Sequence, residues 1–540
     1  MLRPLILASL VHFPLFAANH YIDPQQGSDA VSRSTPSAPW KSTAKLRGVA
    51  LAAGDSVLFR RGTSGTDSLT ITANGQEKRP VVVSSYGDPG LPPALLRSTG
   101  NLILVRKSKY LVIENLTLTG ARAACVDLSD TTNQSIVVQG IEAYDCGGGV
   151  YVSGKNIVVR NNHIHDGHMV VNTKNTKDDD YGASGVNFTN VNGCQVYGNR
   201  FENLKAPSFD YGVDGGAFEF WRSARNCDIY GNFALDVDGF SEFGGQLGDS
   251  VVNVRIHHNV AIDGVLLGCF HIAGAGALFG IGFDGLRLDH NLMVKRKEGN
   301  HGFYLVADGG SHTPASRIQI RNNILVSDSM TYFAYVAPTD SKTAPFLNRN
   351  NLVWSPKLNP FKDSWKAGVG DRFADPLFMD SAWTRTIPTD TALRGFELGR
   401  KSPATGTAEN LGYLSDFFGN PYQRGNVVDI GPFSLGSKPL PPGKNRGSNP
   451  FRLITRHVGG RLELEIEMES AATLDARLLS VDGRSLFRFP IWSVESGQSI
   501  HRLALPPSFG STRILQVTAE GQEPQYEKIG LWSQRSGAAK

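Results

Sequence analysis

The fold is decided between positions 156 and 323, where six short segments repeat one pattern: NIVVRNN (156–162), GCQVYGN (193–199), NCDIYGN (226–232), NVRIHHN (253–259), GLRLDHN (285–291) and RIQIRNN (317–323). Each segment alternates like a strand and ends in an asparagine, which therefore recurs along the chain at a nearly regular spacing. A repeat of roughly 20 to 50 residues with strand-like alternation indicates a solenoid. Because the segments are rich in β-branched residues and glycine, they are not helical. The sequence therefore predicts a β-helix.

The asparagine that ends each segment marks a bend between two sheets. Asparagine tolerates the left-handed backbone conformation that such a bend needs, and its side chain hydrogen-bonds neighbouring backbone groups. In successive coils these side chains are expected to stack into an internal ladder with a structural role. The predicted ladder comprises Asn162, Asn199, Asn232, Asn259, Asn291 and Asn323.

This coil pattern resembles the right-handed parallel β-helix of the pectate-lyase-like superfamily. Residues 21–63 (YIDPQQGSDA…AGDSVLFRRGT) are similar to the entry and first coil of many secreted carbohydrate-active β-helix proteins. Residues 373–435 (FADPLF…VVDIGPFSL) look like the segment that closes such helices. The resemblance implies an all-β solenoid over about residues 21–435. It does not decide the reaction, because this fold hosts lyases, hydrolases, epimerases and non-enzymatic adhesins.

The segment 1–18 has the pattern of a secretory signal peptide. Arg3 precedes an apolar run from Leu5 to Ala17, and the segment ends in small residues at Ala17 and Ala18. The run is too short to span a membrane, and no later stretch approaches a membrane span. We expect a monomer that is secreted or held at the cell surface, with the β-helix over residues 19–435.

Charge and cysteine content exclude other classes. The net charge is only +4, from 54 basic and 50 acidic residues, so no global field indicates a nucleic-acid partner. Five cysteines do not make a dense disulfide framework. Cys194 and Cys227 take the same place in adjacent coils and would stack about 4.8 Å apart. They are either paired or buried as free thiols, and no CxxC or CxxxxH spacing predicts a metal site.

The C-terminal part of the chain predicts a second domain. Residues 436–450 (GSKPLPPGKNRGSNP) have the composition of an exposed linker. Residues 451–540 alternate strongly, with turn signals at Asp482-Gly483 and Glu520-Gly521, which predicts a small antiparallel β-sandwich. Its LLSVDGRSLFR and RILQVTAEG segments resemble C-terminal sorting domains of type IX secretion, which implies the secretion machinery as a partner. A carbohydrate-binding or purely structural sandwich is the alternative.

Three insertions adjoin the same strand position and predict the walls of a binding cleft. They span residues 167–184, 204–216 and 273–284. Loops longer than the fold requires, gathered on one flank, are where solenoids build binding sites. One of these loops carries an acidic tip at residues 178–180, which is either solvated or a cation site with oxygen ligands.

Between these walls, the strand that follows each asparagine bend has an apolar–X–apolar pattern. Side chains alternate between the two faces of a strand, so the apolar flanks fill the core and the central residue points outward. Across successive coils these outward residues form a column, which we call the outward column. It is predicted to contain Asp127, Tyr151, Asn187, Glu219, Glu242, His271, Tyr304 and Tyr335.

The column places two glutamates on consecutive coils. Parallel strands lie about 4.8 Å apart, and two carboxyl groups that close raise the pKa of one of them. An acid and a base at that separation suit glycoside cleavage, and roughly 5 to 5.5 Å suits a retaining mechanism. We predict that Glu219 and Glu242 are the acid/base and the nucleophile or stabiliser, without assigning which is which.

Other residues of the column and its surroundings are assigned supporting roles. His271 would tune or share the proton, and Tyr151, Asn187 and Tyr304 would hydrogen-bond sugar hydroxyls. Trp221 either stacks on a sugar ring or has a core or rim role. Asp214, a further catalytic candidate, and Asp238 precede the two glutamate strands. Each is either a turn residue beside glycine or a third carboxylate.

The predicted function is a secreted glycoside hydrolase that degrades a polysaccharide without a cofactor. Two bare glutamates would repel a polyuronate unless calcium bridged them, which disfavours a lyase. A calcium-assisted polysaccharide lyase is nevertheless the runner-up. A glycan-binding or adhesive surface protein without catalysis is the third alternative.

Overall fold

The computed structural model describes most of the chain up to residue 435 and the strands beyond it. The described residues are 17–174, 179–246, 248–264, 267–272, 281–296, 299–307, 318–327, 330–336, 347–356, 367–379, 392–413, 415–420, 422 and 428–435, with eight strands between 451 and 529. Most of the predicted signal peptide, the linker and much of the 273–284 insertion therefore lie outside the described residues. The chain divides into two compact units, residues 1–438 and 439–540.

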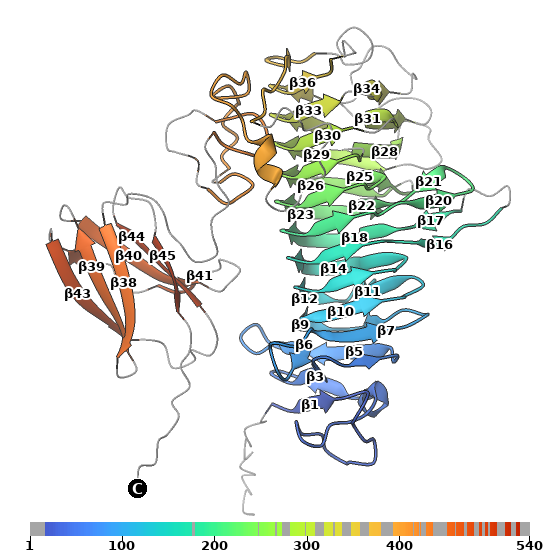
Figure 1. The fold of residues 1–540 in the computed structure, drawn as a ribbon, viewed down its shortest axis with the longest axis vertical. Helices are drawn as coiled ribbons and strands as arrows, with labels where there is room; N and C mark the ends of the chain where they lie inside the picture. Colours follow the sequence, from blue (N-terminus) through green and yellow to red (C-terminus); the bar gives the residue numbers. More distant parts are fainter. Residues whose placement is uncertain are drawn as a thin grey trace, which may run out of the picture. The chain divides into compact units, whose positions relative to one another are not determined.

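Unit 1 is a right-handed parallel β-helix, as the sequence predicts (Figure 1). Strands of successive coils pair in parallel within a 21-stranded and a 12-stranded sheet. The first coils are built by β1 (Asn19–Ile22), β2 (Ala50–Ala52), β3 (Ser56–Arg60), β5 (Leu69–Asn74), β6 (Val81–Tyr86) and β8 (Ile103–Val105). The strands of the outward column are β11 (Ala124–Leu128), β14 (Gly148–Arg160), β18 (Ser184–Tyr197), β22 (Gly216–Trp221), β25 (Gly239–Gly244), β28 (Leu267–Ile272), β31 (Gly299–Ala307) and β34 (Met330–Val336).

The remaining strands of the 21-stranded sheet include those of the repeated segments that end in asparagine. They are β9 (Lys109–Glu114), β12 (Gln134–Gln139), β23 (Ala224–Tyr230), β26 (Ser250–His257), β29 (Gly282–Asp289), β32 (Ile318–Arg321) and β35 (Leu347–Arg349), with the second halves of β14 and β18. The 12-stranded sheet contains β4 (Ser64–Gly65), β7 (Ala94–Arg97), β10 (Leu116–Thr119), β13 (Glu142–Tyr144), β15 (His163–His165), β19 (Arg200–Glu202), β24 (Phe233–Leu235), β27 (Val260–Ile262), β30 (Leu292–Lys295), β33 (Ile324–Ser327), β36 (Leu352–Trp354) and β37 (Arg372–Phe373).

The asparagine ladder is confirmed and is longer than predicted. Each amide Nδ2 donates to Oδ1 of the next asparagine at 2.9 to 3.0 Å, from Asn162 through Asn323. Asn323 continues the ladder to Asn351, whose amide donates to Asp371 at 3.0 Å. Because Asp371 has no amide to donate, it is suited to the end of the ladder.

The expected backbone role of the ladder asparagines is wrong. The left-handed conformation belongs to the residue before each of them, for example Gly198 (φ 65°), His258 (φ 50°) and Asn322 (φ 56°). The ladder asparagine itself points inward and satisfies backbone groups of adjacent coils, as in the 3.0 Å bond from Asn199 Nδ2 to the Val159 carbonyl. The bend and the ladder therefore use neighbouring residues.

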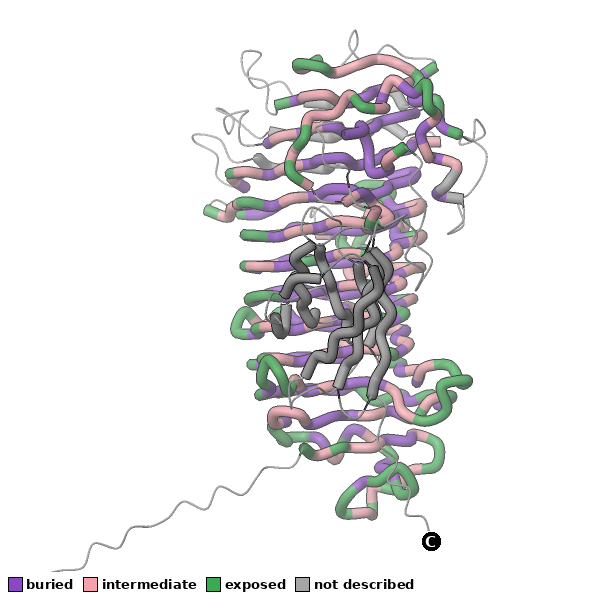
Figure 2. Tube along the Cα trace, turned by 90° about the vertical axis from the view of Figure 1, so that its left-hand side faces the viewer, coloured by how far each residue is buried: buried purple, intermediate pink, exposed green. Residues whose placement is uncertain are grey.

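The core fills the inside of the coils, and along many strands its buried residues alternate with more exposed ones (Figure 2). Beneath the outward column, the rings of Phe188, Phe220 and Phe243 stack on one another, with centroids 4.3 and 4.4 Å apart. These rings directly follow Asn187, Glu219 and Glu242 in the chain. Their stacking fixes the register of the strands that carry the polar side chains.

Disulfides link two pairs of described residues in unit 1. Cys194 and Cys227 are paired in register on β18 and β23 and are bonded, so of the two alternatives the disulfide is correct. Cys125 is bonded to Cys146, a pair that the coil alignment did not predict. Cys146 lies in the turn after β13 rather than on a strand beside Cys125, and alignment of strand positions could not find it.

Two of the predicted wall insertions form hairpins that project from the β-helix (Figure 1). The first pairs β16 (Met169–Val171) with β17 (Tyr181–Gly182), and the second pairs β20 (Ala206–Ser208) with β21 (Gly212–Asp214), both antiparallel. A hydrogen bond of 2.8 Å from Asn172 Nδ2 to the Pro207 carbonyl joins the two hairpins.

The segment after β37 packs back on the side of the coils. The Tyr413 hydroxyl donates to Asp289 at 2.8 Å, and the Tyr422 hydroxyl lies 2.6 Å from His258 Nε2. A short 3-10 helix, Ala392–Phe396, belongs to this segment. Among the described residues, we find no helix with the length and apolar character needed to cross a membrane.

Unit 2 forms two antiparallel sheets, in agreement with the predicted sandwich. One contains β38 (Phe451–Val458), β39 (Arg461–Met468) and β43 (Gly497–Ala504). The other contains β40 (Ala472–Leu479), β41 (Ser485–Arg488), β42 (Trp492–Val494), β44 (Arg513–Ala519) and β45 (Gln525–Ile529).

Candidate active site

The outward column exists over four of its central positions in the predicted order. Tyr151 pairs with Asn187, Asn187 with Glu219, and Glu219 with Glu242. These residues come from β14, β18, β22 and β25, and each is only partly buried while its apolar neighbours on the strand are buried. Strand pairing therefore places two glutamates side by side on consecutive coils, although a complete coil of the chain separates them in the sequence.

The predicted place of His271 is wrong. The residue that pairs with Glu242 is Gly268, which in turn pairs with Tyr304. His271 lies three positions further along β28, within the stretch between Cys269 and Ile272 where the register shifts. The column therefore has a glycine where a histidine was expected, and the coil after Glu242 offers no side chain there. Tyr304 and Tyr335 are paired as predicted.

Glu219 is hydrogen-bonded within the column. Asn187 Nδ2 donates to Glu219 Oε2 at 2.6 Å. Burial raises the pKa of Glu219 to about 8, the negative charge of Asp214 adds to this, and the bond from Asn187 acts in the opposite direction. Near neutral pH, this environment favours the protonated carboxyl, and the charged form depends on Asn187.

The pKa of Glu242 is raised well above its usual value. Burial is the largest cause, followed by the negative charges of Glu219, Asp214 and Asp238. A carboxyl that retains its proton at neutral pH is suited to act as a general acid.

Asp214 and Asp238 extend the glutamate pair into a cluster of four carboxyl groups. Burial and the nearby charge of Asp238 raise the pKa of Asp214 to about 6, although the Gly215 N–H donates to its Oδ1 at 2.7 Å. Asp238 adds negative charge near Asp214 and Glu242, and burial raises its own pKa, although Lys295 and Lys205 act against this. The bond to Gly215 fits the turn-residue alternative for Asp214, and a catalytic role as a third carboxylate stays a prediction.

Gly215 lets the chain turn from the wall into the site. Its φ is +130°, and a Cβ at this position would lie 2.8 Å from the Leu204 carbonyl oxygen. Only glycine fits without strain, so this position joins β21, which ends in Asp214, to β22, which carries Glu219.

The N-terminal end of the column is structural. Asp127 is buried and forms an ion pair of 2.9 Å with Arg106. Although burial acts to raise the pKa of Asp127, the hydrogen bonds from Arg106 and Ser129 hold it below its usual value. Its neighbour Tyr151 has a raised pKa because of burial and the charge of Glu219, so its hydroxyl stays protonated and can donate to a sugar oxygen.

Trp221 is exposed at the end of β22, where it pairs with Gly244 on the next coil. Its indole covers Gly244 so closely that a Cβ there would collide with the ring. The glycine thus leaves room for a flat aromatic surface beside the two glutamates. The exposure of Trp221 excludes a core role, and stacking on a sugar ring stays a prediction beside the rim role.

The hairpin walls carry aromatic residues that the sequence analysis did not single out. Tyr181, Phe209 and Tyr211 have 47%, 59% and 55% of their surface exposed. Val213, an aliphatic residue on β21, is also exposed. Tyr181 also contributes to the raised pKa of Tyr151, which places it beside the column. Insertions flanking a candidate column could have been searched for exposed aromatics, since these are the usual surfaces for sugar rings.

The acidic loop tip ties the two walls together. Asp180 accepts hydrogen bonds from Ser208 Oγ and the Phe209 N–H, both at 2.8 Å. Asp210 accepts from the Asp179 and Asp180 N–H groups at 2.9 and 3.0 Å. These bonds give the carboxylates a role in joining the hairpins. Ligand atoms of Asp179, Asp180 and Asp210 also lie within 4.8 Å of one another, so a cation site at this tip stays a prediction, and Asp178 lies outside the described residues.

Comparisons with known proteins agree with the architecture. Residues 101–325 match a family model described as "Right handed beta helix region". A lacto-N-biosidase from Bifidobacterium longum subsp. longum is 27% identical over 141 residues, which cover 21% of this chain and span 9% of that protein.

Solved structures are similar at low sequence identity. Pectate lyase Pel9A matches with a TM-score of 0.47 and 15% identity, covering 77% of this chain and 96% of its own. A GH136 lacto-N-biosidase from Eubacterium ramulus matches with a TM-score of 0.40 and 13% identity, covering 66% of this chain and 68% of its own.

Proposed function

We propose that this protein is an exported glycoside hydrolase that cleaves a polysaccharide or oligosaccharide with Glu219 and Glu242. The observation that carries this proposal is the in-register pairing of the two glutamates on β22 and β25. The backbones of adjacent parallel strands lie about 4.8 Å apart, so side chains that extend in parallel can hold their carboxyl groups at the roughly 5 to 5.5 Å of a retaining mechanism. The similarity to a lacto-N-biosidase also supports cleavage of a glycosidic bond.

Glu242 is assigned as the general acid and Glu219 as the nucleophile. The proton of Glu242 passes to the glycosidic oxygen as the bond to the anomeric carbon breaks, and the carboxylate of Glu219 takes up that carbon. Water then adds to the carbon, releases Glu219, and returns a proton to Glu242. The hydrogen bond from Asn187 supports this assignment, because it stabilises the charged form of Glu219 but not of Glu242.

The residues around the pair favour a neutral or mixed glycan. Trp221 and the wall residues Tyr181, Phe209 and Tyr211 offer exposed rings for stacking. Tyr151, Asn187 and Tyr304 are assigned to hydroxyl groups of the sugar. Four carboxyl groups in one cluster would repel a polyuronate, so a lyase would need calcium to bridge them. We therefore propose that the reaction needs no cofactor.

Product analysis separates the hydrolase from the lyase. Purified protein is screened against plant, algal and host glycans, with and without a calcium chelator. A hydrolase releases new reducing ends that do not absorb in the ultraviolet, and the chelator leaves the rate unchanged. Products with an ultraviolet-absorbing unsaturated end, formed only when calcium is present, would contradict the proposal and identify a lyase. Tight binding of a glycan without any fragment would instead identify an adhesive protein.

We also propose that residues 1–18 direct export and that unit 2 is a sorting domain that engages the secretion machinery. The support is the sequence resemblance of its strands to type IX sorting domains and its separation from the β-helix as a compact unit. Deletion of unit 2 in the native host should retain the protein inside the cell. Unchanged export after this deletion would contradict the sorting role.

A further inference from the structure

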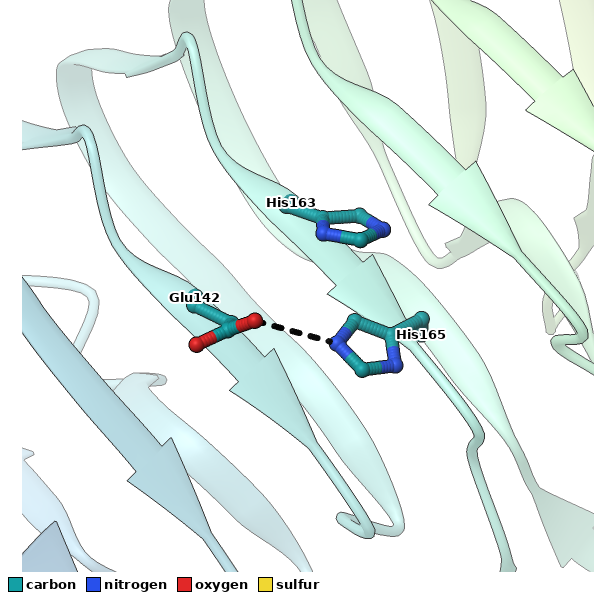
Figure 3. Close-up of side chains that lie close together, drawn as sticks. All are labelled: Glu142, His163 and His165. Atoms are coloured by element: carbon teal, nitrogen blue, oxygen red, sulfur yellow. Dashed lines mark ion pairs between the residues drawn. The ribbon is translucent and has the colours of Figure 1, made fainter. Parts of the chain in front are cut away.

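A second cluster of ligand-type side chains lies on the 12-stranded sheet, away from the carboxyl cluster. His163 and His165 flank the buried Ile164 on β15, so strand alternation places both imidazoles on the outer face. Glu142 on β13 pairs in register with His163. Ligand atoms of these three side chains all lie within 4.8 Å of one another (Figure 3). We call Glu142, His163 and His165 the histidine cluster.

Each histidine has one ring nitrogen held by a carboxylate outside the cluster. His163 Nε2 lies 2.6 Å from Glu202 Oε2, and Arg200 holds the other oxygen of Glu202 at 2.7 Å. His165 Nδ1 lies 2.7 Å from Asp166 Oδ2. The nitrogens that remain are His163 Nδ1 and His165 Nε2. A carboxylate on the far nitrogen is what orients histidines that ligate metals.

One of these remaining nitrogens lacks a hydrogen bond. His165 Nε2 is buried without a partner, and Glu142 Oε1 lies 3.6 Å from it, too far for a hydrogen bond (Figure 3). A buried polar atom without a partner is uncommon in proteins and is costly. A cation between His165 Nε2 and the Glu142 carboxylate would remove this cost.

We propose that Glu142, His163 and His165 bind a divalent transition-metal ion of the zinc class. Two imidazoles and one carboxylate suit Zn²⁺, Cu²⁺ or Ni²⁺, whereas Ca²⁺ and Mg²⁺ prefer oxygen ligands. Three protein ligands leave a fourth position for water. The ion joins two consecutive coils, because Glu142 and the histidines come from neighbouring strands of the stack.

Binding requires a small rearrangement. Zn–N bonds of about 2.0 to 2.1 Å bring ligand atoms to about 3.4 Å from one another in a tetrahedral site. The two imidazoles now stack with centroids 4.2 Å apart, so one ring must turn slightly for both nitrogens to face the ion. Both rings and Glu142 reach solvent, which leaves room for this movement.

The test uses the full chain after a chelator has removed any bound metal. Calorimetry follows the titration with ZnCl₂, and mass spectrometry measures the bound metal. Thermal unfolding is followed in parallel. We expect a single ion per chain, a higher Tm with Zn²⁺, and no competition from Ca²⁺. His165→Asn and Glu142→Gln should abolish the binding. Glu202→Gln, which frees His163, should weaken it by about 10- to 100-fold.

His168→Asn is the matched control, because His168 lies just beyond β15 and contacts Asp145 rather than the cluster. It should bind Zn²⁺ like the wild type. Circular dichroism checks that each variant is folded. Zn²⁺ binding that is equal in wild type and in a folded His163→Asn/His165→Asn variant, or no binding at all, would overturn the proposal.

Discussion

At the residue scale, the site depends on how neighbouring groups move the pKa of Glu219. If Glu219 must be ionised for catalysis, kcat/KM rises with pH through its pKa of about 8. Asp214→Asn removes a negative charge that raises this pKa, so the rising limb should move to lower pH. Asn187→Ala removes a hydrogen bond that lowers it, so the limb should move to higher pH. The measurement is the pH profile of kcat/KM for both variants.

The opposite directions of these two shifts are the discriminating feature. Glu114→Gln serves as control, because Glu114 accepts a hydrogen bond from Gln139 on β12. This variant should leave the rising limb of the pH profile in place. Limbs that move in the same direction in both variants would contradict the assignment of Glu219.

The burial of Glu219 also predicts that ionisation of its carboxyl destabilises the folded protein. The folded-state pKa of Glu219, about 8, is above the ordinary 4.5, so the folded state binds the proton more tightly than the unfolded state. The stability that this contributes is complete below about pH 4.5 and is lost as pH rises through about 8. Glu219→Gln should therefore exceed the wild type in free energy of unfolding near pH 9, by on the order of 1–3 kcal/mol after screening by solvent. Denaturant unfolding at pH 5 and pH 9 measures the difference in free energy of unfolding between Glu219→Gln and the wild type. An equal difference at both pH values would refute the prediction.

The residue scale also shows where sequence analysis was sufficient and where it failed. Glu219 and Glu242 could be paired from the sequence because their strands FEF and SEF lie in consecutive coils, the first between Asn199 and Asn232 and the second between Asn232 and Asn259. His271 was misplaced because both LGC (267–269) and FHI (270–272) fit an apolar–X–apolar pattern. Only the hydrogen-bonded register distinguishes the two, and it selects Gly268.

At the element scale, the asparagine ladder holds the bends of successive coils together. Each interior asparagine both accepts from one neighbour and donates to the next, as Asn259 does between Asn232 and Asn291. Asn259→Asp removes the donor and introduces a buried charge, so it should cost about 3–5 kcal/mol of stability or prevent folding. Asp371→Asn at the end of the ladder should cost about 1 kcal/mol or less.

Thermal and denaturant unfolding of the two variants measure this contrast. Equal losses of stability at both positions would contradict the directional ladder. The ladder itself could be predicted from spacing alone, because one asparagine recurs in every coil. Its backbone geometry could not, because the preceding residue varies among Asn, Gly and His (RNN, YGN, HHN), and each of these tolerates a positive φ.

The walls illustrate a limit of prediction at this scale. Length and position of the insertions at 167–184 and 204–216 were sufficient to predict that these segments leave the regular coils. Their pairing as two hairpins, joined by Asp180 and Asn172, depends on contacts between segments that are distant in the sequence and have no repeating pattern. The repeat pattern therefore could not place the exposed aromatic residues of the walls, because they lie in these hairpins.

At the scale of the whole molecule, the chain separates into two compact units, and all proposed site residues belong to unit 1. We expect a protein that ends at residue 438 to fold alone and to keep kcat/KM within about twofold of the full chain, because a compact unit with its own core can fold alone and this unit contains every proposed site residue. Circular dichroism and kinetics on the same glycan measure this. A folded unit 1 without activity would place part of the site in unit 2.

The whole molecule brings two acidic side chains from separate coils to one place on its surface, and this pairing carries the functional proposal. The most direct measurement is kcat/KM of Glu219→Gln and Glu242→Gln on the glycan that the wild type cleaves, with Glu114→Gln as the matched control. Each active-site variant should lose about 10²- to 10⁴-fold in kcat/KM while it stays folded and still binds the glycan, and the control should keep full activity. Full activity in both glutamine variants would contradict the assignment of this pair as the catalytic groups.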